Sequence, residues 1–600
     1  MNLIFREAVA HDIPAMSAIR LAVTENRLSD PSRVTTAMYH NYLDRLGKSW
    51  VCEVDGLIAG FGAADQAEAS LWALFIDARF ERLGIGKRLL GLLTDYLFAL
   101  GHDAVALSTG VGTRADRFYA SQGWERGEIK NEVEVRYSLS KRGTSQRAVE
   151  LVLSPRGNYM SNLPKGGLAL AALDDQLLHP GVKGLPITEP LRQGAIGVQG
   201  WNVLHADTSF PVAVLKTSAL RHNLDWMRDF CARYGATLAP HGKTTMCPQL
   251  FGAQLANGAW GMTLATATQV QLAHRFGVRR VLLANQLVAR ADIASVLRLM
   301  RDDPDFDCFS LADSLAGVER LAQAVAQHQL PRPLPLLVEL GIAGKRAGCR
   351  SADEAMAVAR AIARAPGLQL AGVEGYEGLL VSNDRTQDVI AVRAFVAQLA
   401  NLVREADGEG LFGGTEILLS AGGSAYFDLV AQGFASVTGA TLPVKAILRS
   451  GCYLTSDHGS YQRLLAELDE RESQSDTACG LQPALEVWSM VQSRPEPGLA
   501  ILTMGKRDAS YDVELPIALA SHRPGPGTPE PLPPGCAIVK MNDQHAYLQL
   551  PAGHSICESL AVGDLICCGI SHPCTTFDKW PLLLAVDDAY QVRYGVNTFF

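Results

Sequence analysis

The chain has 600 residues, too many for one hydrophobic core, and its 48% content of hydrophobic residues is enough to build several domains. Its formal net charge is −8 and its lysines and arginines are dispersed, which excludes a basic patch for nucleic acid or for an anionic membrane. Small molecules are therefore the expected partners.

The N-terminal stretch lacks the pattern of a secretion signal. MNLIFREAVAHDIPAM carries charges and a proline where a signal peptide needs a continuous apolar core, and no later apolar run approaches bilayer length. Twelve cysteines occur, none in a CxxC pair, which is not the pattern of a disulfide framework. The sequence predicts a cytoplasmic protein with reduced cysteines.

Residues 1–140 alternate between strand-like and helix-like segments. WVCEVDGLIAGFGAA reads as two strands around an Asp55-Gly56 turn, since this dipeptide accepts the positive φ angles of a hairpin. SLWALFIDARF reads as a further strand, and the leucines of ERLGIGKRLLGLLTDYLFALG recur at helical spacing until Gly101. An N-terminal α/β domain is predicted over 1–140.

A glycine-containing turn separates that strand from that helix. In Arg82-Leu-Gly84-Ile-Gly86-Lys87 the glycines let the backbone approach an anion, and the first N–H groups of the helix point toward it. A pyrophosphate would fit this turn. A glycine pair is weak evidence by itself, and an ordinary turn between a strand and a helix is the alternative.

Three further regions follow along the chain. Residues 141–200, with KRGTSQR and several prolines, read as a linker and lead-in. Within 201–475, from PVAVLKTSAL onward, short apolar strands alternate with alanine-rich helical segments, which predicts a (β/α)8 barrel. Residues 476–600 keep strands but lose the helices, so a C-terminal β-rich domain is predicted.

A lysine follows the first predicted strand of the barrel proper, in TLAPHGKTTM. Because the C-terminal ends of barrel strands form the active-site mouth, Lys243 is a candidate for a Schiff base with a carbonyl cofactor such as pyridoxal 5'-phosphate (PLP). A surface charge is the alternative for a lone lysine. Other strand ends add candidates: His241, Arg346, Tyr376, the possible phosphate cradle Gly422, Gly423 and Ser424, and Tyr453.

A histidine and a cysteine two residues apart, His572 and Cys574 in SHPCTTFDKW, form a candidate metal site. Both side chains are preferred zinc ligands, and two protein ligands leave positions open for water or substrate. The alternative is a packed cysteine beside a surface histidine.

The order of elements over 1–140, with the glycine turn and then ADRFYASQGWE, resembles the GNAT family of N-acetyltransferases. The resemblance implies that Arg82, Gly84 and Gly86 hold the pyrophosphate of acetyl-CoA and that Tyr119 protonates the leaving thiolate. A core aromatic is the alternative for Tyr119. Glu81 departs from the family pattern, which has Gln or Arg there, and a carboxylate beside a pyrophosphate is repulsive unless a nearby cation offsets it.

The ordered set PVAVLKTSALRHNLDWM, PHGKTTM, GKRAG, GYEG, SAGGS, RSGCY and SHPC resembles the fold-type III PLP enzymes of the D-serine dehydratase and D-threonine aldolase group, over residues 200–600. The resemblance implies a barrel of the alanine racemase type followed by a β-domain, and a homodimer. It also implies that Lys243 bonds covalently to PLP, that the 422–424 glycine turn holds the phosphate, and that Arg346, Tyr376 and Tyr453 surround the cofactor ring or the substrate.

The same resemblance places a metal pair at His572 and Cys574, because the dehydratases of the group carry His with Cys and the aldolases His with Asp. It also implies that residues 542–545 line the metal side of the site, since relatives have a histidine-containing strand there. The expected enzyme is a PLP- and zinc-dependent dehydratase of D-3-hydroxyamino acids such as D-serine or D-threonine, fused to an acetyltransferase domain that uses acetyl-CoA. Retro-aldol cleavage, and a non-catalytic domain that senses acetyl-CoA or an amino acid, remain the alternatives.

Overall fold

The computed structural model describes residues 3–22, 34–54, 56–80, 85–100, 102, 104–111, 113–121, 124–130, 134–140, 167–382, 384–423, 425–471 and 480–600. The chain divides into two compact units, residues 1–153 and residues 154–600. No helix within these described ranges is both long and apolar enough to cross a lipid bilayer.

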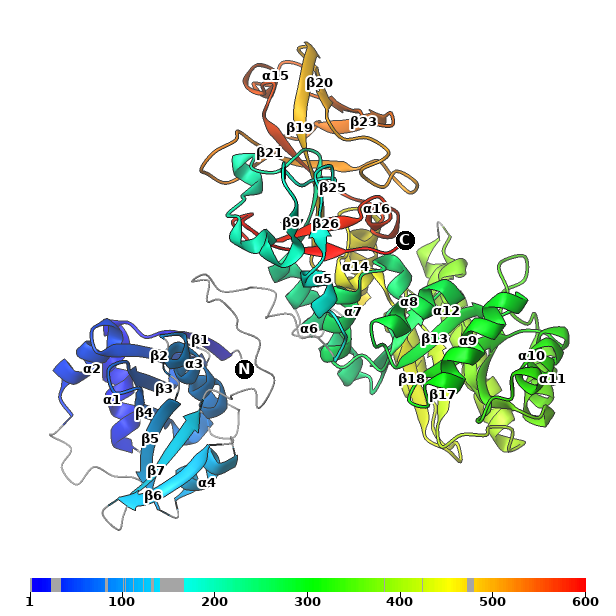
Figure 1. Ribbon diagram of the computed structural model, residues 1–600, viewed down its shortest axis with the longest axis horizontal. Helices are drawn as coiled ribbons and strands as arrows, with labels where there is room; N and C mark the ends of the chain where they lie inside the picture. The colour runs from blue at the N-terminus through cyan, green and yellow to red at the C-terminus, as the bar shows by residue number, and fades with distance from the viewer. Residues whose placement is uncertain are drawn as a thin grey trace. The chain divides into compact units, whose positions relative to one another are not determined.

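The first unit is built on one sheet, which has seven strands among its described residues (Figure 1). In spatial order these are β1 (Leu3–Glu7), β2 (Gly47–Val54), β3 (Leu57–Asp65), β4 (Ser70–Ile76), β5 (Ala104–Gly110), β7 (Glu134–Ser140) and β6 (Glu125–Lys130). Neighbours are antiparallel except β4 and β5, whose parallel pairing is limited to Ser70 and Ala106. The sheet therefore opens between β4 and β5.

Helices cover both faces of this sheet, because its strands alternate their apolar side chains with a period of two. The helices are α1 (Ile13–Ala22), α2 (Thr36–Asp44), α3 (Ile85–Ala99) and α4 (Arg114–Ser121). α1 and α2 pack with Val51 and Phe61 on one face, and α3 packs with Cys52 on the other. The predicted helix that ends before Gly101 is thus observed, and this fold confirms the predicted N-terminal α/β domain.

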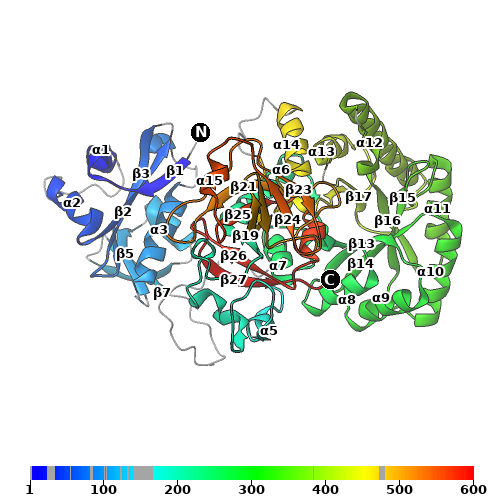
Figure 2. The same cartoon turned by 90° about the horizontal axis from the view of Figure 1, so that it is seen from above.

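The second unit contains a closed parallel barrel, with eight strands in the part of the chain that is described (Figure 2). In chain order they are β11 (Thr237–Leu238), β12 (Met262–Leu264), β13 (Arg280–Gln286), β14 (Asp307–Ala312), β15 (Leu334–Leu340), β16 (Leu368–Gly375), β17 (Ile417–Ala421) and β18 (Val444–Leu448). The amide of Thr263 donates to the carbonyl of Pro240 at 2.9 Å, which closes the barrel between β12 and the end of β11.

The barrel has an apolar interior and an outer ring of helices. One small apolar cluster lies inside it and takes side chains from most of its strands: Ala239, Leu282, Leu311, Leu337, Ala371, Leu418 and Ile447. The helices are α6 (Thr217–Arg233), α7 (Pro248–Ala256), α8 (Ala267–Arg275), α9 (Arg290–Asp302), α10 (Leu315–His328), α11 (Ala352–Arg364), α12 (Arg385–Gly408) and α13 (Phe427–Ala435). Because the interior is packed with apolar side chains, polar functional residues are expected at the ends of the strands.

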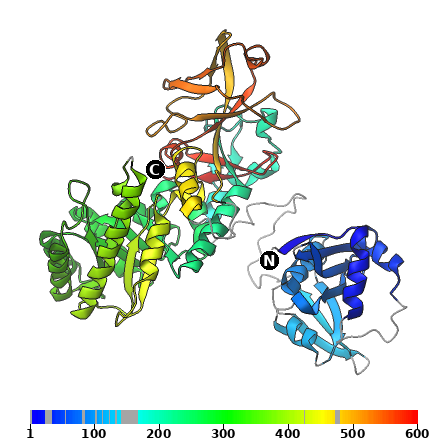
Figure 3. The same ribbon diagram turned by 180° about the vertical axis from the view of Figure 1, so that it is seen from behind.

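The β-rich domain is built on a sheet that is separate from the barrel (Figure 3). Its strands are β19 (Leu485–Glu496), β20 (Leu499–Leu502), β21 (Ile517–His522), β22 (Glu530–Pro531), β23 (Ala537–Met541), β24 (Ala546–Gln549), β25 (Leu565–Gly569), β26 (Leu582–Val586) and β27 (Val592–Asn597). The connecting helices are α14 (Ser460–Arg471), α15 (Ile556–Ser559) and α16 (Cys574–Phe577). The predicted change from helices to strands near residue 480 is observed.

Strand β10 (Val212–Lys216) belongs to this β-rich sheet, although the sequence pattern grouped it with the barrel. It pairs antiparallel with β19 and parallel with β26. The preceding segment also packs there, with α5 (Ala171–Asp174), β8 (Leu177–Leu178) and β9 (Leu191–Arg192), and the bridge between Asn202 and Gln591 adds a further connection. The barrel is therefore inserted between two adjacent strands of the β-rich domain.

Candidate active site

A cavity of about 230 Å³ opens at the C-terminal ends of the barrel strands. Its walls come from the ends of β11, β12, β13, β16, β17 and β18, from the loop after β15, and from the start of α16 in the β-rich domain. The lining residues are His241, Lys243, Thr244, Ala265, Ala284, Asn285, Arg346, Tyr376, Gly422, Gly423, Arg449, Gly451, Cys452, His572 and Cys574. The structure thus brings together most of the residues predicted for the cofactor and both of those predicted for the metal.

Lys243 lies in a short turn, Gly242–Thr244, directly after β11. The turn needs glycine at 242, since a Cβ there would lie 2.8 Å from the Phe251 ring. The Lys243 side chain is accessible in the cavity rather than packed in the core. An accessible amine at the mouth of a barrel is placed to react with a carbonyl group.

His241 lies beside this lysine, and its buried Nδ1 has no hydrogen-bond partner among the described residues. Burial lowers the pKa of His241 well below its usual value, and the neighbouring cations Lys243 and Arg449 lower it further. The imidazole is therefore neutral at physiological pH, and an unpaired polar atom of this kind marks a place where a bound group could be received.

Arg346 and Tyr376 form one wall of the cavity. The guanidinium of Arg346 stacks over the Tyr376 ring with its carbon 4.8 Å from the ring centroid, a cation–π geometry. Burial raises the pKa of Tyr376, so its phenol stays protonated. These two residues together present a positive charge and a neutral hydroxyl to the cavity.

The glycine turn predicted to hold a phosphate reaches the cavity, but its amides are already occupied. The amide of Gly422 donates to Glu377 Oε2 at 3.0 Å, and the amide of Gly423 donates to Glu377 Oε1 at 2.6 Å. Gly422 has a φ of +90°, which only glycine adopts without strain. The third predicted residue of the cradle, Ser424, lies outside the described residues.

Arg449 also lines the cavity, and the sequence reading did not select it. Its Nη2 lies 2.6 Å from Glu374 Oε2 and donates to the carbonyl of Gly375 at 2.6 Å. Burial raises the pKa of Glu374 to about 7, against the effect of Arg449. An arginine directly after a barrel strand, in ILRSGCY, was the signal that could have identified it.

His572 and Cys574 project into the cavity from the β-rich domain. His572 Nδ1 lies 2.6 Å from Asp512 Oδ2, and Thr575 Oγ1 donates to the other oxygen of Asp512 at 2.7 Å. A carboxylate that holds one ring nitrogen orients the other nitrogen, Nε2, as in many metal-ligating histidines. The imidazole is therefore oriented for a partner inside the cavity.

Cys574 has its own polar neighbours. Its Sγ lies 3.7 Å from the Sγ of Cys452 and 3.5 Å from the Thr244 hydroxyl. The hydrogen bond with Cys452 lowers the pKa of Cys574, and His572 and Thr244 lower it further. The hydrogen bond to Cys574 in turn raises the pKa of His572, with Asp512 adding to this effect. The two groups therefore shift each other's pKa in opposite directions, and each favours the charged form of the other.

The donor set fits zinc, because thiolate sulfur and imidazole nitrogen are ligands that zinc prefers. Within the described part of the chain, no group of three or more His, Cys, Asp or Glu side chains is arranged to hold a metal ion. A metal at His572 and Cys574 would therefore take its remaining ligands from water or substrate. Such open coordination is typical of catalytic rather than structural sites.

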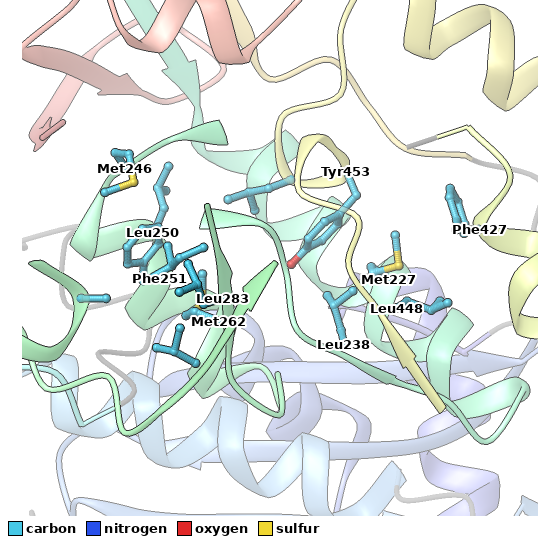
Figure 4. Close-up of a cluster of buried hydrophobic side chains, with 14 of the residues drawn as sticks. Met227, Leu238, Met246, Leu250, Phe251, Met262, Leu283, Phe427, Leu448 and Tyr453 are labelled. Carbon is cyan, nitrogen blue, oxygen red and sulfur yellow. The ribbon is translucent and has the colours of Figure 1, made fainter. Parts of the chain in front are cut away.

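Tyr453 is not part of this cavity, although the sequence placed it around the cofactor. It is 1% exposed, and its hydroxyl accepts a hydrogen bond from Gln254 Nε2 at 3.2 Å. Figure 4 shows it among buried side chains that include Leu238 and Met227. The short turn after β18 directs Cys452 to the cavity and Tyr453 into the core.

The 542–545 segment also lies elsewhere. It forms the exposed turn between β23 and β24, where Asp543 pairs with Arg507 at 3.6 Å, and it does not line the cavity. The sequence signal for this position was weak, because a histidine in a short polar turn has no partner that the sequence identifies.

The predicted acetyl-CoA site of the first unit is described only in part. Arg82 and Gly84 lie outside the described residues. Gly86 is in the first turn of α3, where a Cβ would make ordinary 3.7 Å contacts with Ile76 and Phe118. Tyr119, on α4, is 8% exposed, packs against the rings of Trp124 and Tyr137, and has its pKa raised by burial.

Three stretches of the chain match models of known protein families. Residues 15–124 match the acetyltransferase (GNAT) family. Residues 215–435 match the N-terminal domain of alanine racemase, and residues 484–586 match the putative serine dehydratase domain.

Curated proteins give related matches. A D-threonine aldolase from Arthrobacter sp is 25% identical over 413 residues, which cover 68% of this chain and 94% of the relative. A 3-hydroxy-D-aspartate aldolase from Paracoccus denitrificans is 25% identical over 309 residues, which cover 51% of this chain and 74% of the relative.

Solved structures share the fold of the second unit. A D-threonine aldolase from Filomicrobium marinum superposes with a TM-score of 0.55 at 22% identity, covering 66% of this chain and 97% of that one. A D-threo-3-hydroxyaspartate dehydratase from Delftia sp. HT23 superposes with a TM-score of 0.53 at 21% identity, covering 66% and 99%. Both resemblances predicted from the sequence are confirmed: the chain joins a GNAT-family domain to a barrel of the alanine racemase type and a β-domain that matches the serine dehydratase domain.

Proposed function

We propose that the second unit is a PLP- and zinc-dependent dehydratase that converts a D-3-hydroxyamino acid into a 2-oxo acid and ammonia. The observation that carries this proposal is that Lys243 and the pair His572 and Cys574 line the same cavity. The named activities of the relatives, an aldolase for D-threonine and a dehydratase for D-threo-3-hydroxyaspartate, both concern amino acids with a hydroxyl on the β-carbon.

The residues around Lys243 fit PLP. Lys243 would bond to the cofactor aldehyde, neutral His241 would lie near the ring, and Arg346 would offset an anionic group. When bound, PLP supplies an electron sink for the α-carbon of an amino acid. Lys243 and the protonated Tyr376 both line the cavity, where they would exchange protons with the substrate.

His572 and Cys574, at the other side of the cavity, would assist the departure of the β-hydroxyl group. Hydroxide is a poor leaving group, and a zinc ion held by His572 and Cys574 would act as a Lewis acid for the departing oxygen. Asp512 would fix the orientation of His572, and Thr244 and Cys452 would hold Cys574 as a thiolate. One of the relatives' structures is described as a variant in the metal-free form, which supports a metal in this group.

The elimination balances without an external redox partner. The α-proton and the β-hydroxyl leave as water, the remaining enamine becomes an imine, and water then releases ammonia and the 2-oxo acid. D-serine would give pyruvate and D-threonine would give 2-oxobutanoate. The chain supplies the proton-exchanging groups at Lys243 and Tyr376 for these steps.

The test is to incubate the PLP-loaded protein separately with D-threonine, L-threonine and D-serine, with and without a zinc chelator, and to identify the carbon products. Chelator-sensitive 2-oxo acid from the D-isomers is the expected result. Full activity of a protein with alanine at both 572 and 574, after removal of zinc, would exclude the metal part of the proposal.

Retro-aldol cleavage is the second candidate, and the curated aldolases at 25% identity favour it. It would use the same cavity but break the bond between the α- and β-carbons of the substrate. D-threonine would then give glycine and acetaldehyde instead of 2-oxobutanoate. The product analysis above therefore separates the two reactions in one experiment.

For the first unit we propose N-acetyl transfer from acetyl-CoA, based on the match of residues 15–124 to the acetyltransferase family. Burial keeps the Tyr119 phenol protonated, as an acid for the departing thiolate must be. A domain that binds acetyl-CoA without transferring it is the alternative. Incubation with acetyl-CoA and a panel of D-amino acids, followed by measurement of free thiol, distinguishes transfer from binding.

A further inference from the structure

Two cysteine side chains meet at the candidate metal site. Cys452 begins the short helical turn Cys452–Leu454 after β18, and Cys574 begins α16 in the β-rich domain. Their sulfur atoms lie 3.7 Å apart, although the two residues are 122 positions apart in the sequence. The fold has therefore brought a thiol of the barrel into contact with a thiol of the β-rich domain.

Small molecules in the cavity can reach this pair. Cys452 and Cys574 both line the cavity, and both are partly exposed. Seven of the eleven described cysteines are buried, and the remaining two, Cys536 and Cys557, do not line the cavity. A small oxidant that enters the cavity therefore meets two adjacent thiols rather than one.

The sulfur atoms are close enough to form a bond by rotation of their side chains. They are 3.7 Å apart and must approach by about 1.7 Å to reach the disulfide length of about 2.0 Å. The Thr244 hydroxyl contacts both sulfurs, at 3.9 Å from Cys452 and 3.5 Å from Cys574. A Cβ on Gly451 would lie 2.6 Å from Thr244 Oγ1, so the backbone beside Cys452 is packed closely against this threonine. Rotation about the Cα–Cβ bonds moves the sulfurs without moving that backbone.

Oxidation by hydrogen peroxide would take two balanced steps. One thiol attacks an oxygen of the peroxide, the O–O bond breaks, and the products are a sulfenic acid and water. The other thiol attacks the sulfenic sulfur, the S–S bond forms, and the hydroxyl leaves with the thiol proton as a second water. Two electrons pass from the two sulfurs to the peroxide. A thiol reductant returns them and restores both thiols.

The disulfide would take one ligand away from the proposed zinc site. A cysteine binds zinc through its thiolate, and a sulfur bonded to a second sulfur has no thiolate to offer. His572 would then be the one member of the proposed ligand pair left to hold the metal. The same bond would join the barrel covalently to the β-rich domain beside the cavity.

We propose that Cys452 and Cys574 form a site of reversible oxidation, at which a peroxide closes a disulfide and thereby releases the metal. The oxidation depends only on the two thiols, whereas the release of metal rests on the proposed function. Zinc bound to Cys574 would slow the oxidation, because the metal occupies the sulfur that has to react.

The first test treats the full chain, without zinc and without reductant, with hydrogen peroxide and maps the linked peptides by mass spectrometry. A linkage between Cys452 and Cys574 that a thiol reductant reverses is expected. Bound zinc should slow its formation at least about tenfold. Linkage of Cys574 to a different cysteine, oxidation to sulfinic acid without any linkage, or no oxidation of the pair would each overturn the proposal.

The second test uses Cys452→Ser, which removes one thiol and leaves Cys574 in place. Under the same treatment this variant should form no linkage at Cys574. Cys557→Ser is the matched control, because Cys557 is also partly exposed but donates to the carbonyl of Pro551 at 3.2 Å, outside the cavity. It should form the linkage between Cys452 and Cys574 as the wild-type chain does.

Zinc affinity, measured by competition with a chromogenic chelator, separates this inference from the proposed function. The affinity of the wild-type chain should fall at least about 100-fold on oxidation and return on reduction. Unchanged affinity after linkage would show that the disulfide does not release the metal. If the reduced chain binds no zinc, the zinc part of the proposed function fails together with the release of metal, while peroxide-dependent linkage would still support the oxidation site.

Discussion

The two units of this chain hold their predicted sites in different ways. In the second unit, residues from the ends of most barrel strands and from the β-rich domain converge on one cavity, and several of their pKa values are shifted by their neighbours. In the first unit, the described part of the predicted site consists of Gly86 and of Tyr119, which packs among aromatic rings. Electrostatic coupling between side chains therefore identifies the candidate site of the second unit more clearly than that of the first unit.

Replacing Lys243 is expected to cause the largest difference between the activities of the two units. Lys243→Ala removes the amine that would bond to PLP, so the lyase activity should fall at least about 10³-fold. Acetyl-CoA binding by the same protein should stay unchanged. Lys445→Ala is the matched control, because Lys445 pairs with Glu416 away from the cavity. Lyase activity that survives Lys243→Ala would remove the central element of the proposed function.

Tyr119→Phe tests whether the first unit depends on one proton-donating residue as strongly as the second unit depends on Lys243. Acetyl transfer should fall about 100-fold, because Phe cannot give a proton to the thiolate. Since burial raises the pKa of Tyr119, the wild-type rate should not decline through loss of this proton until the pH exceeds the usual tyrosine pKa of about 10. An unchanged rate would identify Tyr119 as a core aromatic. The first unit would then have no proton donor identified among its described residues, unlike the second unit.

Asp512→Asn tests the metal side of the cavity without touching a proposed ligand. The change weakens the charged partner of His572 Nδ1, so zinc affinity should fall about 10- to 100-fold. Competition with a chromogenic chelator measures this affinity directly. Asp578→Asn is the control, since Asp578 pairs with Lys579. Equal affinity in both variants would mean that Asp512 does not orient the histidine toward a metal.

Alanine at one glycine of each unit gives the smallest expected effects. Gly422→Ala should lower the stability of the second unit by about 1–3 kcal/mol, because the residue has a φ of +90° and a Cβ would lie 2.9 Å from Leu448. Gly86→Ala should raise helix stability by about 0.5–1 kcal/mol, because its Cβ meets ordinary contacts. Thermal unfolding measures both. Destabilisation by Gly86→Ala would show that the packing around this turn does not tolerate a Cβ atom.

The sequence predicted the parts of the fold that depend on local patterns. Alternating apolar strands and helices identified both α/β regions, and the strand ends supplied Lys243, Arg346 and Tyr376 for the cavity. What remained hidden depends on contacts between distant residues. Glu377 meets the glycine amides only through the neighbouring strands β16 and β17, and Asp512 meets His572 only after the β-rich domain has folded.

Tyr453 and Arg449, which lie in one short segment, show the limit of predicting site residues from the sequence. Both follow β18, and the tyrosine was selected from its place after a strand and from the family resemblance. The direction of the Tyr453 side chain depends on the short helical turn Cys452–Leu454, which no periodic pattern in the sequence predicts. The arginine consequently reaches the cavity, and the tyrosine fills the core beside Gln254.

The placement of β10 has a consequence for synthesis of the chain on the ribosome. Its residues Val212–Leu215 are buried by β19 and β26, and both of those partners follow the entire barrel in the sequence. At 5–20 residues per second, the parallel partner of β10 is made roughly 20 to 70 s later. The nascent barrel thus has time to fold while the apolar strand before it is still unpaired, and we expect β10 to need protection by a chaperone during translation.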